Sequence, residues 1–311
     1  MNSRRSFLKV ASLASTAVLT GINPLFAQVA SATSSARKVY VFSKHLQWLD
    51  YPGMAATARE IGFDGVDLTV RPNGHVLPER VKEDLPKAVE ALKAEGLLAD
   101  RMTTAITDPD DALTLDILET AAKTGVKNYR LGWLAYEPSV SIEKNIENFN
   151  RKLKKLAELN KKFGLTAAYQ NHAGEMAGSP VWDIKPMLEE IDPAEVGVRY
   201  DIRHATIEGG KSWPLGLRLL ADHINSIDIK DAVWKQRNGK WNPTTVPLGE
   251  GMVDFERFFR MISDYNISGD FTMHFEYPIG GAERGATELS CSPETLMAAM
   301  KKDLKILRSF I

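Results

Sequence analysis

The most constraining feature of this 311-residue sequence is a repeat in which an amphipathic stretch ends at a glycine and leads into a β-rich run. The pattern is clearest at Gly62, Gly96, Gly125 and Gly164. Glycine is favoured just after the last turn of a helix because it takes the left-handed backbone conformation at little cost. Each repeat therefore predicts one helix followed by one strand.

The same alternation continues to the end of the chain and predicts eight strands. Their expected ranges are residues 39–42, 65–70, 97–104, 128–131, 165–170, 196–200, 224–229 and 270–275. Amphipathic helices are expected at residues 79–95, 112–123, 142–163, 181–191, 213–223, 255–265 and 293–310.

Eight strand–helix units predict a single (β/α)8 TIM barrel, a fold of about 250 residues. No linker or change of composition divides residues 37–311, so we expect one domain there. A doubly wound open sheet is the weaker alternative, because no Gly-x-Gly-x-x-Gly sequence follows the first strand. For the same reason no nucleotide cofactor is expected.

The N-terminus carries the pattern of a twin-arginine signal peptide over residues 1–27. Arg4 and Arg5 precede a weakly apolar run at residues 10–19, and small residues offer cleavage after Ala27 or as late as Ala32. The run is too short and too polar for a stable membrane anchor. We therefore expect export of the folded protein by the Tat translocase, and a location in the periplasm.

The charge balance and the cysteine content exclude several kinds of partner and site. Lys and Arg number 39 against 40 Asp and Glu, so a basic face for nucleic acid is not expected. The single cysteine, Cys291, excludes both an internal disulfide and a cysteine-rich zinc cluster.

Five of the six histidines follow predicted strands, where the active site of a (β/α)8 barrel lies. These are His45, His75, His172, His204 and His274. Structural hydrogen bonding is the alternative for each of them singly, but the group as a whole indicates a polar site.

Charged residues follow the later strands in the same way. The sixth predicted strand ends at Asp201, the seventh at Asp228 and Lys230, and the eighth at Glu276. Side chains alternate along a strand, so Gln170 lies on the same face as His172. Converging carboxylates and imidazoles can hold a divalent ion or transfer protons directly. A buried ion-pair network that fixes loops is the alternative.

Several of these segments resemble one known family in their order and spacing. The sequence resembles the xylose isomerase-like TIM barrels, also called the sugar phosphate isomerase/epimerase superfamily, over nearly all of the predicted barrel. The segments that carry the resemblance are EIGFDGVD at 60–67, YQNHAG at 169–174, YDIRHA at 200–205, IKD at 229–231, PLGEGMVDF at 247–255 and HFEY at 274–277.

The resemblance implies one divalent metal, held in this family by Glu, Asp, His and Glu on strands 5 to 8. Here Gln170 stands at the first position, Asp228 at the third, and His274 or Glu276 at the fourth, so only Asp201 is retained. We expect a rebuilt site for manganese, magnesium or zinc from His172, Asp201, Asp228 and either His274 or Glu276. A metal-free acid–base site is the alternative.

The resemblance also implies an isomerase or epimerase that removes a proton beside the carbonyl of a sugar or keto-sugar, and the signal pattern adds the expectation that this enzyme is exported. Glu276 is the expected base, His172 or His274 the partner acid, and Lys230 the group that stabilises the enolate-like charge. Residues expected to bind the substrate are His45, Arg71, His75, Arg130, Gln170 and His204.

Two other hypotheses stay open at this stage. One is a lyase or hydrolase-type enzyme on a 3-keto-glycoside, and the other is a sugar-binding barrel without catalysis. Residues 234–245 predict a hairpin or lid over the site, and residues 280–292 a loop that moves or joins copies in a homo-oligomer.

Overall fold

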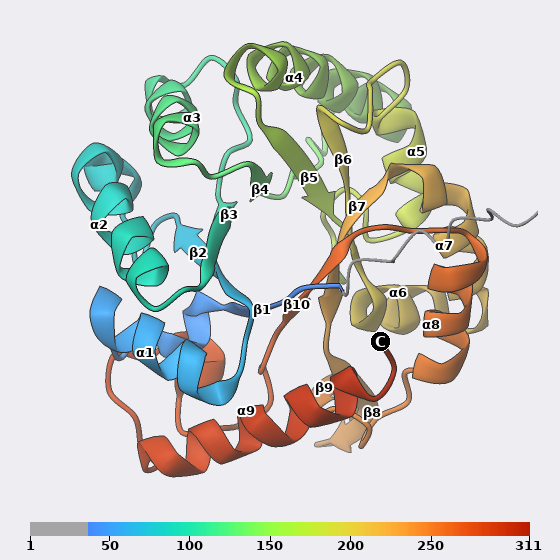
Figure 1. The fold of residues 1–311 in the computed structure, drawn as a ribbon. Coiled ribbons are helices and arrows are strands. Elements are labelled where there is room, and N and C mark those ends of the chain that lie inside the picture. The colour runs from blue at the N-terminus through green and yellow to red at the C-terminus, as the bar shows by residue number, and fades with distance from the viewer. Residues whose placement is uncertain (1–36) are drawn as a thin grey trace, which may run out of the picture. The chain divides into compact units, whose positions relative to one another are not determined.

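The computed structural model describes residues 37–311, which form a closed barrel of eight parallel strands surrounded by helices (Figure 1). The export signal predicted at residues 1–27 lies outside the described residues. The barrel strands are β1 (Val39–Phe42), β2 (Gly65–Val70), β3 (Leu98–Thr104), β4 (Asn128–Arg130), β5 (Thr166–Gln170), β6 (Val196–Asp201), β7 (Ile224–Ile229) and β10 (Asp270–Met273). All eight lie where the sequence predicts strands, so the predicted (β/α)8 fold is confirmed.

The barrel closes between its first and last strands. β1 pairs with β10 on one side, with Val39 opposite Phe271, and with β2 on the other, with Tyr40 opposite Gly65. A Cβ at Gly65 would lie 2.6 Å from the Tyr40 ring, so this close contact requires glycine.

The helices form the outer layer. They are α1 (Tyr51–Ile61), α2 (Val81–Ala94), α3 (Ala112–Thr124), α4 (Ile142–Phe163), α5 (Ile184–Met187), α6 (Ile202–Gly209), α7 (Trp213–Leu220), α8 (Phe255–Asp264) and α9 (Pro293–Arg308). Gly125 and Gly164 end α3 and α4 with φ of 91° and 67°, which confirms the predicted role of these glycines.

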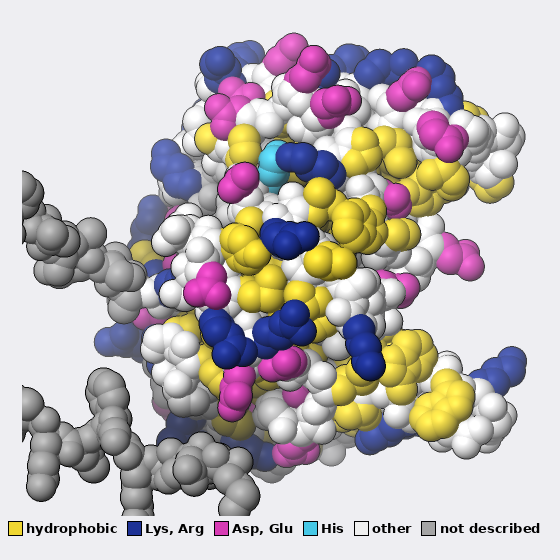
Figure 2. All heavy atoms as spheres, turned by 90° about the vertical axis from the view of Figure 1, so that its right-hand side faces the viewer, with side chains coloured by type: hydrophobic (Ala, Val, Ile, Leu, Met, Phe, Trp, Pro, Cys, Tyr) yellow, Lys and Arg dark blue, Asp and Glu magenta, His cyan; other side chains and the backbone are white. Residues whose placement is uncertain are grey.

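The outward surface of this helical layer is mixed in charge. Figure 2 shows the side that carries α7 and α8, where Lys, Arg, Asp and Glu side chains are spread among hydrophobic ones. Within residues 37–311, none of the helices combines the length and the apolar character that crossing a bilayer requires.

Two helical segments differ from the prediction. The segment predicted as helix 181–191 contains a 3-10 turn and the short helix α5, and Glu190 then takes a φ of 60° that no helix continues. Helix α6 was not predicted, because it begins directly after β6 without a separating loop. Its N-cap is Asp201, whose carboxylate accepts from the His204 N–H at 3.0 Å.

The predicted hairpin at residues 234–245 is confirmed. Strands β8 (Asp231–Arg237) and β9 (Lys240–Val246) pair antiparallel. Asn238 and Gly239 form the turn with φ of 50° and 75°, as a two-residue hairpin turn with positive φ at both positions requires. The lid function of this hairpin stays a prediction.

Candidate active site

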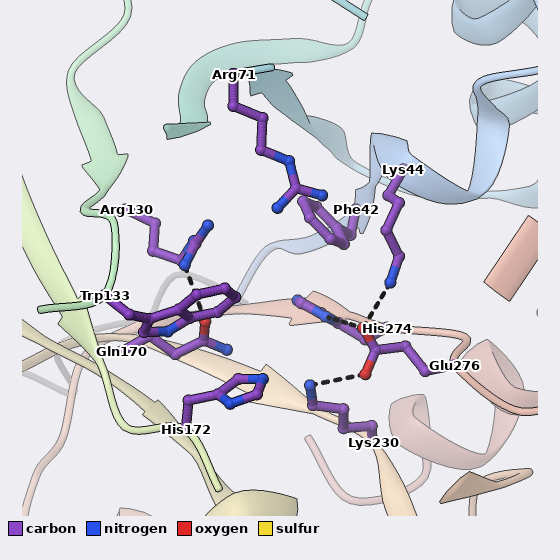
Figure 3. Close-up of a pocket in the computed structure, with 10 residues that line it drawn as sticks. All are labelled: Phe42, Lys44, Arg71, Arg130, Trp133, Gln170, His172, Lys230, His274 and Glu276. Atoms are coloured by element: carbon purple, nitrogen blue, oxygen red, sulfur yellow. Dashed lines mark hydrogen bonds and ion pairs between the residues drawn. The ribbon is translucent and has the colours of Figure 1, made fainter. Parts of the chain in front are cut away.

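A small pocket lies where the barrel strands end (Figure 3). It is lined by Phe42, Lys44, Arg71, Arg130, Trp133, Gln170, His172, Lys230, His274 and Glu276. The structure thus brings together seven of the predicted site residues, namely Arg71, Arg130, Gln170, His172, Lys230, His274 and Glu276. The expected alternation beyond β10 is confirmed, since His274 and Glu276 line the pocket while Phe275 is buried in the core.

The Lys230 ammonium is surrounded by three acceptors at the base of this pocket. Its Nζ lies 3.0 Å from a carboxylate oxygen of Asp201, 3.0 Å from one of Glu276, and 3.0 Å from Nε2 of His204. Burial lowers the pKa of Lys230, but the charges of Asp201 and Glu276 outweigh it and hold the pKa above its ordinary value. The side chain is therefore a fixed positive charge.

Glu276 lies between two ammonium groups. One carboxylate oxygen is 2.7 Å from Lys44 Nζ, and the other is 3.0 Å from Lys230 Nζ (Figure 3). Burial raises the pKa of Glu276, but the charges of Lys230 and Lys44 hold it well below its ordinary value. Because an ammonium group lies against each oxygen of this carboxylate, the geometry does not favour the predicted role of Glu276 as the base.

A second ion-pair network lies deeper in the barrel around Arg199. Its guanidinium binds Asp228 and Asp67 at 2.6 Å each, and all three side chains are at most 3% exposed. The Gln170 amide nitrogen donates to Asp228 at 2.6 Å and to Asp201 at 3.0 Å. Arg199 and Asp67 were missed from the sequence, although Arg199 lies two residues before Asp201 and alternation puts both on one face.

The predicted metal ligands do not fit a divalent cation in this arrangement. Asp201 is paired with Lys230, and Asp228 is paired with Arg199, so protein cations already neutralise both carboxylates. The Gln170 N–H groups point at these carboxylates, where a metal ligand would present oxygen. Among residues 37–311, no group of three or more His, Cys, Asp or Glu side chains is arranged to hold a metal ion.

His172 is the pocket residue best placed to accept a proton. Its Nδ1 donates to the Ala173 carbonyl at 2.8 Å, and its ring packs between Trp133 and His204 at centroid distances of 4.4 and 4.0 Å. Burial, helped by the charge of Lys230, lowers the pKa of His172 to about 4. The neutral ring thus carries its hydrogen on Nδ1, which leaves Nε2 as an acceptor, although the lowered pKa makes it a weaker base than an ordinary imidazole.

Two predicted substrate-binding histidines lie outside the pocket lining and support loops instead. His45 Nδ1 donates to the Ala282 carbonyl at 3.0 Å, and Nε2 accepts from the Phe275 N–H at 2.9 Å. Both nitrogens of His75 are also used, at 3.1 Å from Ser43 Oγ and 3.1 Å from the Leu46 carbonyl. With both nitrogens occupied inside the protein, neither ring offers a group to a ligand.

Three other predicted residues lie just behind the pocket. His204, Asp201 and Asp228 are at most 2% exposed, and each contacts a lining residue rather than the pocket space. Lys44, which was not predicted, belongs to the lining; its place two residues after β1 was the available signal.

Comparison with known proteins gives one family and a set of similar folds. The sequence model of the xylose isomerase-like TIM barrel family matches residues 55–308. None of the curated proteins compared with the chain matches it.

The similar solved structures include two sugar epimerases and a dehydratase, all at low identity. The 3-keto-D-glucoside 4-epimerase YcjR from E. coli has a TM-score of 0.62 and 16% identity, over 88% of this chain and 99% of its own. The D-allulose 3-epimerase from Methylomonas sp. has a TM-score of 0.64 and 15% identity, over 88% and 98%. The probable 3-DHS dehydratase AsbF from Bacillus anthracis has a TM-score of 0.60 and 15% identity, over 87% and 98%.

Proposed function

Because the chain belongs to the xylose isomerase-like TIM barrel family, we propose that it is an isomerase- or epimerase-type enzyme that moves a proton beside the carbonyl of a sugar or keto-sugar. One observation carries the proposal. A neutral imidazole with a free Nε2, on His172, and a permanently charged ammonium, on Lys230, line the same small pocket. Sugar epimerases among the similar folds support the same general activity.

The proton transfer uses these two groups in complementary roles. His172 Nε2 takes the proton from the carbon beside the carbonyl, and the electron pair of the broken C–H bond moves through the new C=C bond to the carbonyl oxygen. Lys230 stabilises the negative charge that develops on this oxygen, which is worth more in a partly dry pocket than in water. Return of the proton to the former carbonyl carbon, with transfer of the neighbouring hydroxyl proton to the former carbonyl oxygen, gives an isomer. Delivery of a proton from water to the other face of the original carbon, with the first proton left on His172 and later lost to water, gives an epimer.

The buried acids hold this arrangement in place. Asp201 and Glu276 keep the Lys230 ammonium charged and fix its position, while Lys44 adds a second positive charge on the other side of Glu276. No step is assigned to a bound metal, because the carboxylates that would hold it are paired with Lys230 and Arg199. We place the activity in the periplasm on the evidence of the twin-arginine pattern in residues 1–27.

Solvent deuterium tests the proposal. A panel of aldoses, ketoses and keto-sugars is incubated with the protein in D2O, and each recovered sugar is analysed by proton NMR and mass spectrometry. We expect one deuterium at the carbon beside the carbonyl, and a loss of about 100- to 10,000-fold in exchange rate for His172→Gln. His223→Gln, which makes the same change at the end of a helix, is the matched control and should exchange at the wild-type rate.

The same experiment separates the other hypotheses. A lyase acting on a 3-keto-glycoside would release its leaving group with the first proton removed, so the aglycone would appear in the spectrum. A sugar that binds tightly but neither gains deuterium nor is converted to a product would contradict the proposed function. The sugar-binding barrel without catalysis would then be the remaining hypothesis.

A further inference from the structure

Arg130 is a buried guanidinium that no carboxylate of residues 37–311 neutralises. It is 4% exposed, and it donates to the Thr104 carbonyl at 3.1 Å and to the Gln170 side-chain oxygen at 3.4 Å. It also lies over the Trp133 ring at 4.4 Å. These contacts are all uncharged, and a buried charge without a counterion is costly to the fold.

Arg71 is a second cation of this kind. Its guanidinium lies over the Phe42 ring at 5.3 Å, and no salt bridge joins it to the part of the chain that the structure describes. Figure 3 shows Arg71 and Arg130 entering the pocket from β2 and β4, with both guanidinium groups directed toward the space between them.

The residues that line the pocket include more cations than carboxylates. It carries four cationic side chains, on Lys44, Arg71, Arg130 and Lys230, and one carboxylate, on Glu276. Each oxygen of Glu276 is paired with a lysine, and no salt bridge joins this carboxylate to Arg71 or Arg130. A ligand that is itself negative would supply the missing counterion.

We propose that the substrate carries an anionic oxygen group, a carboxylate or a phosphate, that binds between Arg71 and Arg130 while its carbonyl end lies against Lys230 and His172. The assignment of the carbonyl end rests on the proposed function, whereas the anion site rests on the two arginines alone. Guanidinium groups bind such anions through paired N–H donors, which fixes the orientation of the ligand as well as its charge. A sugar held at its anionic end would thus present its carbonyl to the same groups in every turnover.

Matched pairs of ligands test this proposal. D-Glucuronate is compared with D-glucose, and D-fructose 6-phosphate with D-fructose, by isothermal titration calorimetry at low salt; sodium sulfate serves as an anion without a sugar. We expect the charged member of at least one pair to bind wild type about tenfold or more tightly than its neutral partner. A preference for the glucuronate pair identifies a carboxylate site, and a preference for the phosphate pair identifies a phosphate site.

Substitutions of the two arginines test whether they cause the preference for the charged ligand. Arg71→Gln and Arg130→Gln should each reduce the ratio of charged to neutral affinity by about tenfold, whereas Arg130→Lys should retain part of it. Arg284→Gln removes one positive charge from a side chain that is 83% exposed, and it should keep the wild-type ratio. The half-buried position of Arg71 makes its variant the safer one for folding.

The outcomes for the two proposals differ. If charged and neutral partners bind equally, or if the preference survives in both Arg71→Gln and Arg130→Gln, the anion site is wrong even when neutral sugars exchange deuterium. If sulfate and the charged ligands bind through the arginines but no sugar of either kind exchanges deuterium, the anion site stands and the proposed function is wrong.

Discussion

Arg199 and Arg130 are equally buried in the same barrel but are neutralised in opposite ways. They are 3% and 4% exposed. Arg199 binds two carboxylates, whose attraction outweighs the effect of burial and raises its pKa. Arg130 binds only uncharged groups, and burial lowers its pKa to about 9.

Two buried carboxylates, one paired with an arginine and one without a cation, show the same difference for negative charges. Burial raises the pKa of Asp228, but Arg199 outweighs it and holds the pKa far below its ordinary value. Asp303 on α9 accepts from the Tyr277 hydroxyl at 3.0 Å and forms no salt bridge within residues 37–311, and burial raises its pKa to about 6. The paired charges of Arg199 and Asp228 therefore belong to the scaffold, whereas the unpaired charges of Arg130 and Asp303 cost stability. Arg130 lines the pocket, where a negative ligand can offset that cost.

The largest effect should come from breaking the paired arginine. Arg199→Met leaves Asp67 and Asp228 buried without a counterion, and we expect the free energy of unfolding to fall by about 3–5 kcal/mol. Arg130→Met removes an unpaired charge and should cost less than about 1 kcal/mol, or stabilise the protein. Urea unfolding followed by circular dichroism compares the two; equal losses would show that pairing does not distinguish these arginines.

A pH-dependent effect should follow from the unpaired carboxylate. The raised pKa of Asp303 means that the folded protein binds more protons than the unfolded chain between about pH 4 and pH 6, so this group costs stability as the pH rises through that window. Asp303→Asn keeps the oxygen that accepts from Tyr277 and removes the titration. As the pH rises from 4 to 7.5, the free energy of unfolding of this variant should increase relative to that of wild type by up to about 3 kcal/mol.

Urea unfolding of wild type and Asp303→Asn at both pH values measures this gain. A difference between the two proteins that does not change with pH would show that Asp303 titrates normally in the fold. Asp64→Asn, at a partly exposed carboxylate paired with Arg308, is the control.

The sequence predicted the barrel well because a glycine marks the start of four of the strands and the strands carry buried apolar residues. Helix α6 escaped prediction because Asp201 ends a strand and caps a helix at once, so no loop signal separates the two. No glycine marks the boundary between β6 and α6.

The sequence predicted where the site residues lie better than it predicted which of them form ion pairs or hydrogen bonds with one another. Residues at the ends of strands were expected to meet, and Arg71, Arg130 and His172 line one pocket, while their roles stay predictions. Alternation along a strand gives the face of a side chain but not its partner. That Lys230 would neutralise Asp201, or that both nitrogens of His45 would be used inside the protein, depends on contacts between distant segments.

An intermediate effect should follow when the paired lysine is removed. Lys230→Ala frees Asp201, His204 and Glu276 from the ammonium that they surround, and these are the ligand types that Mn²⁺ and Zn²⁺ accept. We expect the variant to bind Mn²⁺ at least about tenfold more tightly than wild type, or about 1.4 kcal/mol, in calorimetry.

A second substitution checks that this metal binds at the freed acids. Adding Asp201→Asn to the Lys230→Ala variant should abolish the gain. The contradicting result is that wild type itself binds one equivalent of Mn²⁺ and loses it when only Asp201→Asn is introduced. That result would show that the pairing of Asp201 with Lys230 does not exclude a metal.

The smallest effect should come from a pair on the surface. Lys301 on α9 lies 3.0 Å from Glu60 on α1, much like the distance of Lys230 from Asp201, but the two side chains are 44% and 65% exposed. Water already solvates both charges, so Lys301→Ala should change the free energy of unfolding by only about 0–1 kcal/mol. A loss near that of Arg199→Met would mean that ion-pair distance alone, and not burial, sets the energetic difference between paired and unpaired charges in this barrel.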